Sequence, residues 1–243
     1  MKINRSLPLV SVAALIATGL SFAPVAAQAP PTPDQVVATL KQNLEESQKR
    51  LRQYEWVETT VISLKGEEKA RKQQRVYYGG DGKLTKVAIG SPAPEAAAGR
   101  GGRGGRLKET IVENKKDDMQ EYMARATALI QQYVPPNPAQ IQKAKDAGKM
   151  TVRPPQQGKL RVEFPDFVQP SDLLAIDVDA AAAGLTAISV ATYLDKREDA
   201  VMLDVKFGNL SDGTSYTAAT TLDAKAKNIR VVLTNAGHRP LAQ

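Results

Sequence analysis

Apolar residues recur at three- and four-residue steps between Val37 and Tyr54, and charged residues occupy the other helical positions of this stretch. Thr32, Pro33 and Gln35 stand just before it as a cap, a proline at the first helical position and an amide three residues after the cap. This order is a helix-start signature. The pattern therefore predicts an amphipathic helix with one apolar stripe.

The pattern changes after this helix, because Tyr54–Leu64 is rich in β-branched and aromatic residues, which favour a strand. A second strand is expected at about Lys69–Tyr78, beyond a turn at Gly66. The turn Gly79–Gly82 then leads into Leu84–Ile89. These segments predict a three-stranded antiparallel meander.

Helical spacing returns in Leu107–Val134 and is clearest from Met119 onward, and the prolines at 135 and 136 end it. Asn137, Pro138 and Gln140 repeat the helix-start signature for a shorter helix, for which Gly148 is a suitable C-terminal cap. The chain beyond Gly158 is predicted to be mostly strand. The expected strands are Lys159–Phe164, Leu173–Val178, Leu185–Leu194, Ala200–Phe207, Ser215–Leu222 and Asn228–Thr234.

Several of these strands alternate apolar and polar residues and are joined by short polar turns, which is typical of an antiparallel sheet with one face in water. The other face must be covered, and about three helices are available for this. The prediction is an α+β fold, in which a curved antiparallel half-barrel of about eight to ten strands is covered by about three helices.

The N-terminus has the composition of a cleavable signal peptide, residues 1–27. Lys2 and Arg5 precede a mostly apolar run, Leu7–Leu20, and small residues lead to a cleavage site between Ala27 and Gln28. A retained anchor is the alternative, but the run is shorter than the roughly 20 residues that span a bilayer. We expect a periplasmic or secreted product of the general secretory route, with a linker at 28–33 and a single domain at 34–243.

The chain of 243 residues contains no cysteine, which excludes disulfides, thiolate metal sites and a lipid-modified cysteine. Its net charge of +7 falls to +5 without Lys2 and Arg5, and residues 91–106 form a low-complexity Gly/Arg loop. Such a repeat is typical of RNA binding inside cells. We expect no nucleic-acid partner, because aromatic residues are not interleaved with the arginines and the protein is predicted to be exported. A solvated linker or a loop that touches anionic headgroups is the expectation instead.

Candidate catalytic groups are few. The one histidine, His238, lies in a Gly-His-Arg-Pro segment near the C-terminus, where chain ends are commonly mobile. Asp166, Asp172, Asp177 and Asp179 could serve glycoside hydrolysis or calcium binding if they converged. The alternative is that these aspartates are ordinary solvated side chains at the end of a strand. We expect no catalytic residue, no metal site and no cofactor.

The element order, and locally the stretch Leu44–Gly90, resembles the LolA/LolB-like family of periplasmic lipoprotein and lipid carriers. That resemblance implies a half-barrel with an apolar cavity under its helices, and a non-enzymatic carrier of a lipid or acyl chain. The residues that could line such a cavity are Trp56, Met119, Tyr122, Met123 and Leu129. They could equally pack the fold shut. The alternative function is an envelope protein-interaction module that uses the basic loop or a sheet edge; an enzyme is the third.

Overall fold

The computed structural model describes residues 33–90, 105–156, 158–179, 181–182 and 184–241. The predicted signal peptide with its cleavage site at Ala27 and Gln28, the linker up to residue 32, and residues 91–104 of the Gly/Arg loop lie outside these ranges. The helical elements within them are α1 (Pro33–Leu51), α2 (Gly105–Ile130), α3 (Pro138–Asp146) and the 3₁₀ segment η1 (Lys225–Lys227). The strands are β1 (Tyr54–Leu64), β2 (Glu67–Tyr78), β3 (Leu84–Ala88), β4 (Thr151–Gln156), β5 (Lys159–Pro165), β6 (Leu173–Asp179), β7 (Gly184–Tyr193), β8 (Ala200–Asn209), β9 (Ser215–Ala224) and β10 (Ile229–Pro240).

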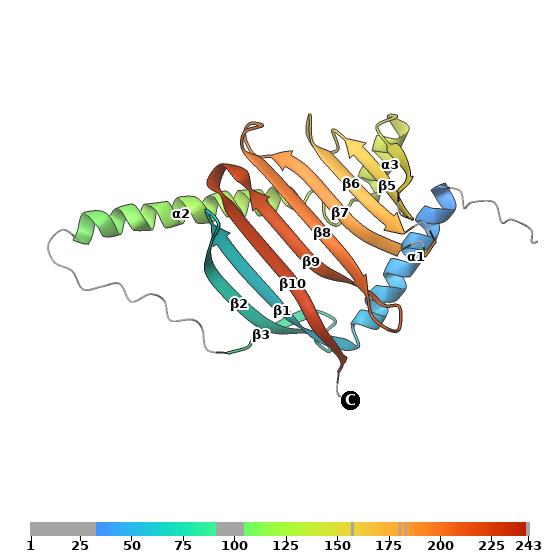
Figure 1. The fold of residues 1–243 in the computed structure, drawn as a ribbon, viewed down its shortest axis with the longest axis horizontal. Coiled ribbons are helices and arrows are strands. Elements are labelled where there is room, and N and C mark those ends of the chain that lie inside the picture. The colour runs from blue at the N-terminus through green and yellow to red at the C-terminus, as the bar shows by residue number, and fades with distance from the viewer. Residues whose placement is uncertain (1–32, 91–104, 157, 180, 183, 242–243) are drawn as a thin grey trace, which may run out of the picture. The chain divides into compact units, whose positions relative to one another are not determined.

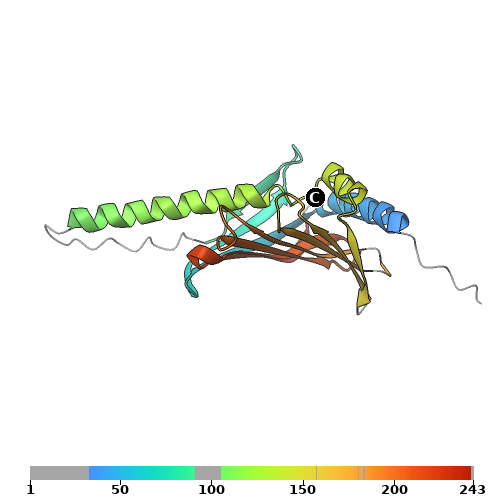
Figure 2. The same cartoon turned by 90° about the horizontal axis from the view of Figure 1, so that it is seen from above.

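The strands form one antiparallel sheet in the order β3-β2-β1-β10-β9-β8-β7-β6-β5-β4 (Figure 1). The sheet is not closed, because β3 and β4 are its two edges. The three helices lie on the same side of it (Figure 2). This arrangement confirms the predicted α+β half-barrel with about three covering helices. We call the helix-covered side of the sheet the inner face and the opposite side the outer face.

Strand pairing shows which residues share the inner face. Val201, Leu203 and Val205 of β8 are buried and alternate with exposed Met202 and polar neighbours. Because directly paired residues lie on one face of a sheet, the inner face can be followed outward from these three. Toward β4 it continues through Thr192, Val190, Ile188, Leu174, Ile176, Phe164, Val162 and Val152. Toward β1 it continues through Ala224, Leu222, Thr220, Ile229, Val231, Leu233, Leu64, Ile62 and Thr60.

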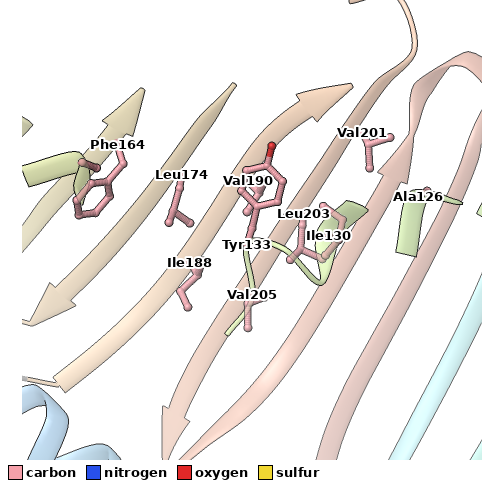
Figure 3. Packing of buried hydrophobic residues seen from close by; sticks show 11 residues of the cluster. Ala126, Ile130, Tyr133, Phe164, Leu174, Ile188, Val190, Val201, Leu203 and Val205 are labelled. Carbon is pink, nitrogen blue, oxygen red and sulfur yellow. The ribbon is translucent and has the colours of Figure 1, made fainter. Parts of the chain in front are cut away.

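The main core covers the β5–β8 part of the inner face. Ala126 and Ile130 of α2, Tyr133 in the turn that follows, and Ala144 of α3 pack against it (Figure 3). α1 lies at one end of the sheet, where the Ser215 backbone N–H of β9 donates a 3.1 Å hydrogen bond to the Ser47 Oγ. A helix-rich layer therefore closes this half of the inner face against water.

A buried polar network fixes the turn after α2 to the sheet. The Tyr133 hydroxyl is hydrogen-bonded to the carboxylate of Asp172 and to Thr192 Oγ1. Asp172 also accepts three backbone N–H bonds from residues 167–169, so its charge is satisfied although the residue is buried. Burial raises the pKa of Tyr133, and the adjacent Asp172 carboxylate raises it further. The phenol therefore remains a neutral donor.

The outer face is polar, as the alternation of the strands predicts. Arg153 and Arg161 both pair with Glu163, and Arg161 also contacts Asp177 at 3.4 Å. The two arginines are 61% and 39% exposed, whereas Glu163 and Asp177 are only 13% and 20% exposed. Because the arginines remain in contact with water, such pairs contribute little stability individually. They keep the outer face compatible with water.

The observed elements differ from the predicted ones mainly in two places, and in addition α2 already begins at Gly105, within the predicted 91–106 loop. β4 contains Pro154 and Pro155, which argue against a strand, yet it pairs with β5 as an edge strand, where proline is tolerated. β10 runs on to Pro240, so His238 lies in a strand and not in a free tail. A register shift against β1 and the positive φ of Gly237 (66°) accommodate this extension.

Candidate functional site

An apolar pocket of about 370 Å³ lies between α2 and the β1/β2/β10 part of the sheet. Met119, Gln120 and Met123 form its helix wall. Its sheet wall consists of Ile62, Leu64, Lys69, Ile229 and Val231. The lining surface is apolar even where Lys69 and Gln120 contribute to it, so their hydrocarbon stems face the pocket. The volume falls in the lower part of the range of about 300–1,000 Å³ that is common for small-molecule sites.

The pocket follows from how α2 crosses the sheet. Met119, Tyr122, Met123 and Ala126 form one helical stripe, because residues three and four apart share a face. Ala126 is fully buried in the main core, and Tyr122 rests on Ala224 and Ile229 in a second, smaller cluster. Met119 and Met123 lie next to Tyr122 on the same helix face, but they are only partly buried against this smaller cluster. The stripe is therefore tightly packed at Ala126 and lines an open pocket at Met119 and Met123.

Ile62 marks the open side of the pocket, since 40% of this large apolar residue is exposed on the inner face. The methionine side chains opposite are unbranched and adaptable, which suits a surface that must fit differently shaped apolar groups. Burial raises the pKa of Tyr122, with a further contribution from Asp199, so this phenol is neutral at ordinary pH. The Lys227 ammonium lies 5.7 Å from the centre of its ring.

The structure brings together two of the five residues predicted to line a cavity. Met119 and Met123 line the pocket, and Tyr122 packs beside it. Leu129 packs against the main core instead, and Trp56 lies toward the other end of β1. Sequence reasoning missed the sheet wall, because nothing in the sequence indicates that β1 and β10 are neighbours.

Trp56 belongs to an aromatic group with His238, Tyr216 and Tyr78. Its ring stacks on His238 with centroids 5.5 Å apart, and its indole N–H donates to Asn235 Oδ1 at 3.1 Å. The His238 ring lies 4.1 Å from that of Tyr216. Burial lowers the pKa of His238. The contacts described for His238 are aromatic, which is the environment of a packed residue.

The four aspartates considered for catalysis or calcium binding do not form one cluster. Asp172 holds its own loop, and Asp177 contacts Arg161. Asp179 accepts the backbone N–H groups of residues 181 and 182, and Asp166 accepts that of Ser171. That last hydrogen bond, with Lys149 as the next contribution, lowers the pKa of Asp166. In the part of the chain that the structure describes, no group of three or more acidic or histidine residues could hold a metal ion.

A larger hollow of about 460 Å³ lies between α3 and the loop after β5. Its lining is mixed, and it includes Gln140, Lys143 and the ion pair of Lys149 with Asp166. Such a surface is readily hydrated, and displacing its water costs free energy unless a ligand replaces the lost hydrogen bonds. The smaller apolar pocket is therefore the better candidate for a ligand site.

No protein-family model and no curated protein matches the sequence. Among solved structures, the chain is similar to a LolA superfamily protein from Nitrosomonas europaea. The superposition covers 84% of this chain and 94% of that one, with 7% sequence identity and a TM-score of 0.36. This is a likeness of architecture alone, of the kind that the element order predicts.

Proposed function

We propose that this protein is an exported, non-enzymatic binding or carrier protein, and that it holds the apolar chain of a lipid or other amphiphile between α2 and the sheet. The observation that carries the proposal is the apolar pocket between Met119 and Met123 on one side and the β1/β10 strands on the other. No helix among the described residues is long and apolar enough to span a membrane.

The binding energy would come from removing apolar surface from water. Each methylene group that enters the pocket contributes about 0.8 kcal/mol before the cost of association is subtracted. The exposed pocket residue Ile62 would lose contact with water at the same time. An alkyl chain suits this site because the lining offers no polar surface to orient a polar ligand.

The first test is binding of a fluorescent fatty acid to two matched variants. Ile62→Glu places a carboxylate in the pocket wall, whereas Val152→Glu makes a similar change at the far edge of the same inner face. The two side chains are 40% and 41% exposed, so neither substitution should unfold the protein. We expect Ile62→Glu to weaken binding at least about tenfold and Val152→Glu to leave it unchanged.

Equal affinity for the fatty acid in both variants and in the unchanged protein would exclude this pocket as the site. Native mass spectrometry of protein purified from its own cell envelope is the second test. A co-purifying lipid supports the carrier proposal. The absence of any lipid, together with no binding of the fluorescent fatty acid, contradicts it.

The open edge of the sheet favours a second candidate, an envelope protein-interaction module. The β4 edge is interrupted by Pro154 and Pro155, whereas β3 contains no proline. Leu84, Val87 and Ile89, in or next to β3, are all more than 40% exposed. An extended segment of a partner could add to this edge by strand pairing. Val87→Lys should then abolish co-purification of the partner, while Met202→Lys on the outer face should not.

The Gly/Arg loop is the other contact surface expected for such a module. Its residues 91–104 lie outside the described part of the chain. Deletion of residues 91–106 tests its role. If pull-down of a partner survives the deletion, the loop acts only as a linker.

A further inference from the structure

The pocket ends where two hairpin tips meet. Leu64 and Ile229, which both line the pocket, are directly paired neighbours in β1 and β10. One residue further on, the Lys65 backbone N–H donates a 2.8 Å hydrogen bond to the carbonyl oxygen of Asn228. The β1–β2 turn and the β9–β10 turn are thereby joined. Together they border the apolar pocket at this end of the sheet.

These two tips carry more positive than negative charge. Residues 65–69 and 223–230 contain five cationic and three acidic side chains. Each of the three acids forms an ion pair with a neighbouring cation. Glu67 pairs with Lys69, and Glu68 pairs with Arg71. The Asp223 carboxylate lies 3.5 Å from the Lys225 ammonium and 3.9 Å from the Arg230 guanidinium. Two lysines, Lys65 and Lys227, have no ion pair to any carboxylate that the structure describes.

Of these two lysines, Lys227 is the one that contacts α2, the helix that forms one wall of the pocket. Its ammonium lies over the ring of Tyr122, and Tyr122 directly precedes the pocket residue Met123. Two carboxylates, those of Asp199 and Asp195, act on Tyr122. Asp199 acts on the hydroxyl of Tyr122, and Asp195 pairs with Arg125.

The helix itself adds no acid to the pocket lining. Asp118 and Glu121 are both exposed. Glu121 is about 100° around the helix from Tyr122, whereas Asp118 is one turn before Tyr122 and lies at the edge of the stripe, outside the pocket lining. The hairpin tips beside the pocket therefore carry two lysines without a carboxylate partner among the described residues, and no acidic residue lines the pocket. A hydrophobic slot next to such cations is complementary to an amphiphile with a negative head and a single apolar tail.

We infer that the ligand of the pocket is a single-chain anionic amphiphile, whose carboxylate or phosphate head lies at the Lys65/Lys227 tips while its alkyl chain enters between Met119, Met123 and Ile62. This inference rests on the proposed function and adds the charge class of the ligand. The lysines act at the boundary with water, so their effect is on selectivity more than on total affinity.

The test is displacement of a neutral apolar fluorophore, N-phenylnaphthylamine, from the full mature chain. The competitors are dodecanoate, dodecyl phosphate and dodecyltrimethylammonium, which share the alkyl chain and differ in head charge. We expect the two anions to displace the fluorophore at concentrations about fivefold to tenfold lower than the cation. High salt should reduce this preference, because the head lies near solvent.

Two double variants identify the source of the preference. Lys65→Gln with Lys227→Gln removes the two unpaired lysines at the tips and should abolish the preference for anions. Lys159→Gln with Lys206→Gln removes the same charge from exposed positions elsewhere and should leave it intact. Inorganic phosphate separates a headgroup site from a simple anion site. It should not displace the fluorophore at concentrations at which dodecyl phosphate does.

The possible outcomes separate the two proposals. If all three amphiphiles displace the fluorophore equally, or if the preference survives in Lys65→Gln/Lys227→Gln, the anionic-head inference is wrong and the apolar-chain proposal stands. If the fluorophore does not bind, or no amphiphile displaces it, the proposed function itself fails. Displacement by inorganic phosphate alone would make the tips an anion site that is independent of any alkyl chain.

Discussion

The two halves of the inner face are built from the same sheet and the same helix, but they differ in how completely they are covered. In the β5–β8 half, Leu174, Val190 and Val201 are less than 2% exposed beneath α2, Tyr133 and α3. In the β1/β10 half, α2 contacts the sheet through Tyr122, but Ile62 is 40% exposed and an apolar pocket remains between the helix and the strands. The closed half has the packing of a stable core, whereas the other half leaves the pocket in which we propose that a ligand binds.

The largest expected difference between the halves is in the free energy of unfolding. Leu174→Ala should lower it by about 3–4 kcal/mol, because the closed half cannot collapse around the lost side chain. Leu64→Ala, the same change on the inner face of the open half, should lower it by less than about 1 kcal/mol. Urea unfolding of the two variants measures both values. Equal losses would mean that the pocket half is packed as tightly as the core.

The next test concerns the polar network that holds the closed half together. Tyr133→Phe removes the hydroxyl that is hydrogen-bonded to both Asp172 and Thr192. It should lower the free energy of unfolding by about 2 kcal/mol at neutral pH, because the Asp172 acceptor is charged.

The Tyr133 network also predicts a pH dependence. The pKa of Tyr133 is raised in the folded protein, so the unfolded chain releases this proton first, near pH 10. The contribution of Tyr133 is therefore complete below about pH 10 and is lost as the pH rises above it, by about 1.4 kcal/mol per pH unit. Urea unfolding of both proteins on either side of pH 10 measures this slope. If the unchanged protein and Tyr133→Phe show the same alkaline slope, the buried phenol is not the cause.

The smallest effect is expected at His238, at the Trp56 end of the open half. Burial lowers its pKa, so the folded protein binds this proton less readily than the unfolded chain. Its contribution to stability is present above about pH 6.5 and is lost as the pH falls through the lower folded pKa.

Because His238 is the one histidine of the whole chain, its NMR titration needs no assignment by mutagenesis. Trp56→Leu removes the stacking ring and should move the pKa of His238 back toward its ordinary value. A folded pKa at or above the ordinary value in the unchanged protein would show that the ring is solvated.

The sequence predicted the elements well where local patterns decide them. Asn137 caps α3 by accepting the Ala139 N–H at 2.9 Å, and the Gly79–Gly82 turn closes the β2–β3 hairpin as expected. β4 was missed because Pro154 and Pro155 argue against a strand unless its position at the edge is known. Edge position is a property of the assembled sheet.

The candidate site could be predicted only in part, for the same reason. The spacing of Met119, Tyr122 and Met123 shows that they share a helical face, and two of them line the pocket. Ile62 and Val231 become neighbours only through the pairing of β1 with β10. No local pattern records this pairing, because the two strands are more than a hundred residues apart. Trp56, which is also predicted to line a cavity, lies toward the other end of β1 and does not line this pocket.

The pairing of β1 with the last strand also governs the order of assembly. The β1–β3 meander and the β4–β9 part of the sheet share no strand pairing until β10 joins them, with Tyr54 opposite Pro240 at one end. Contacts this distant in sequence form slowly, since a long loop must close first. Because β10 lies between β1 and β9, a chain synthesised from its N-terminus cannot complete this sheet before β10 has been made.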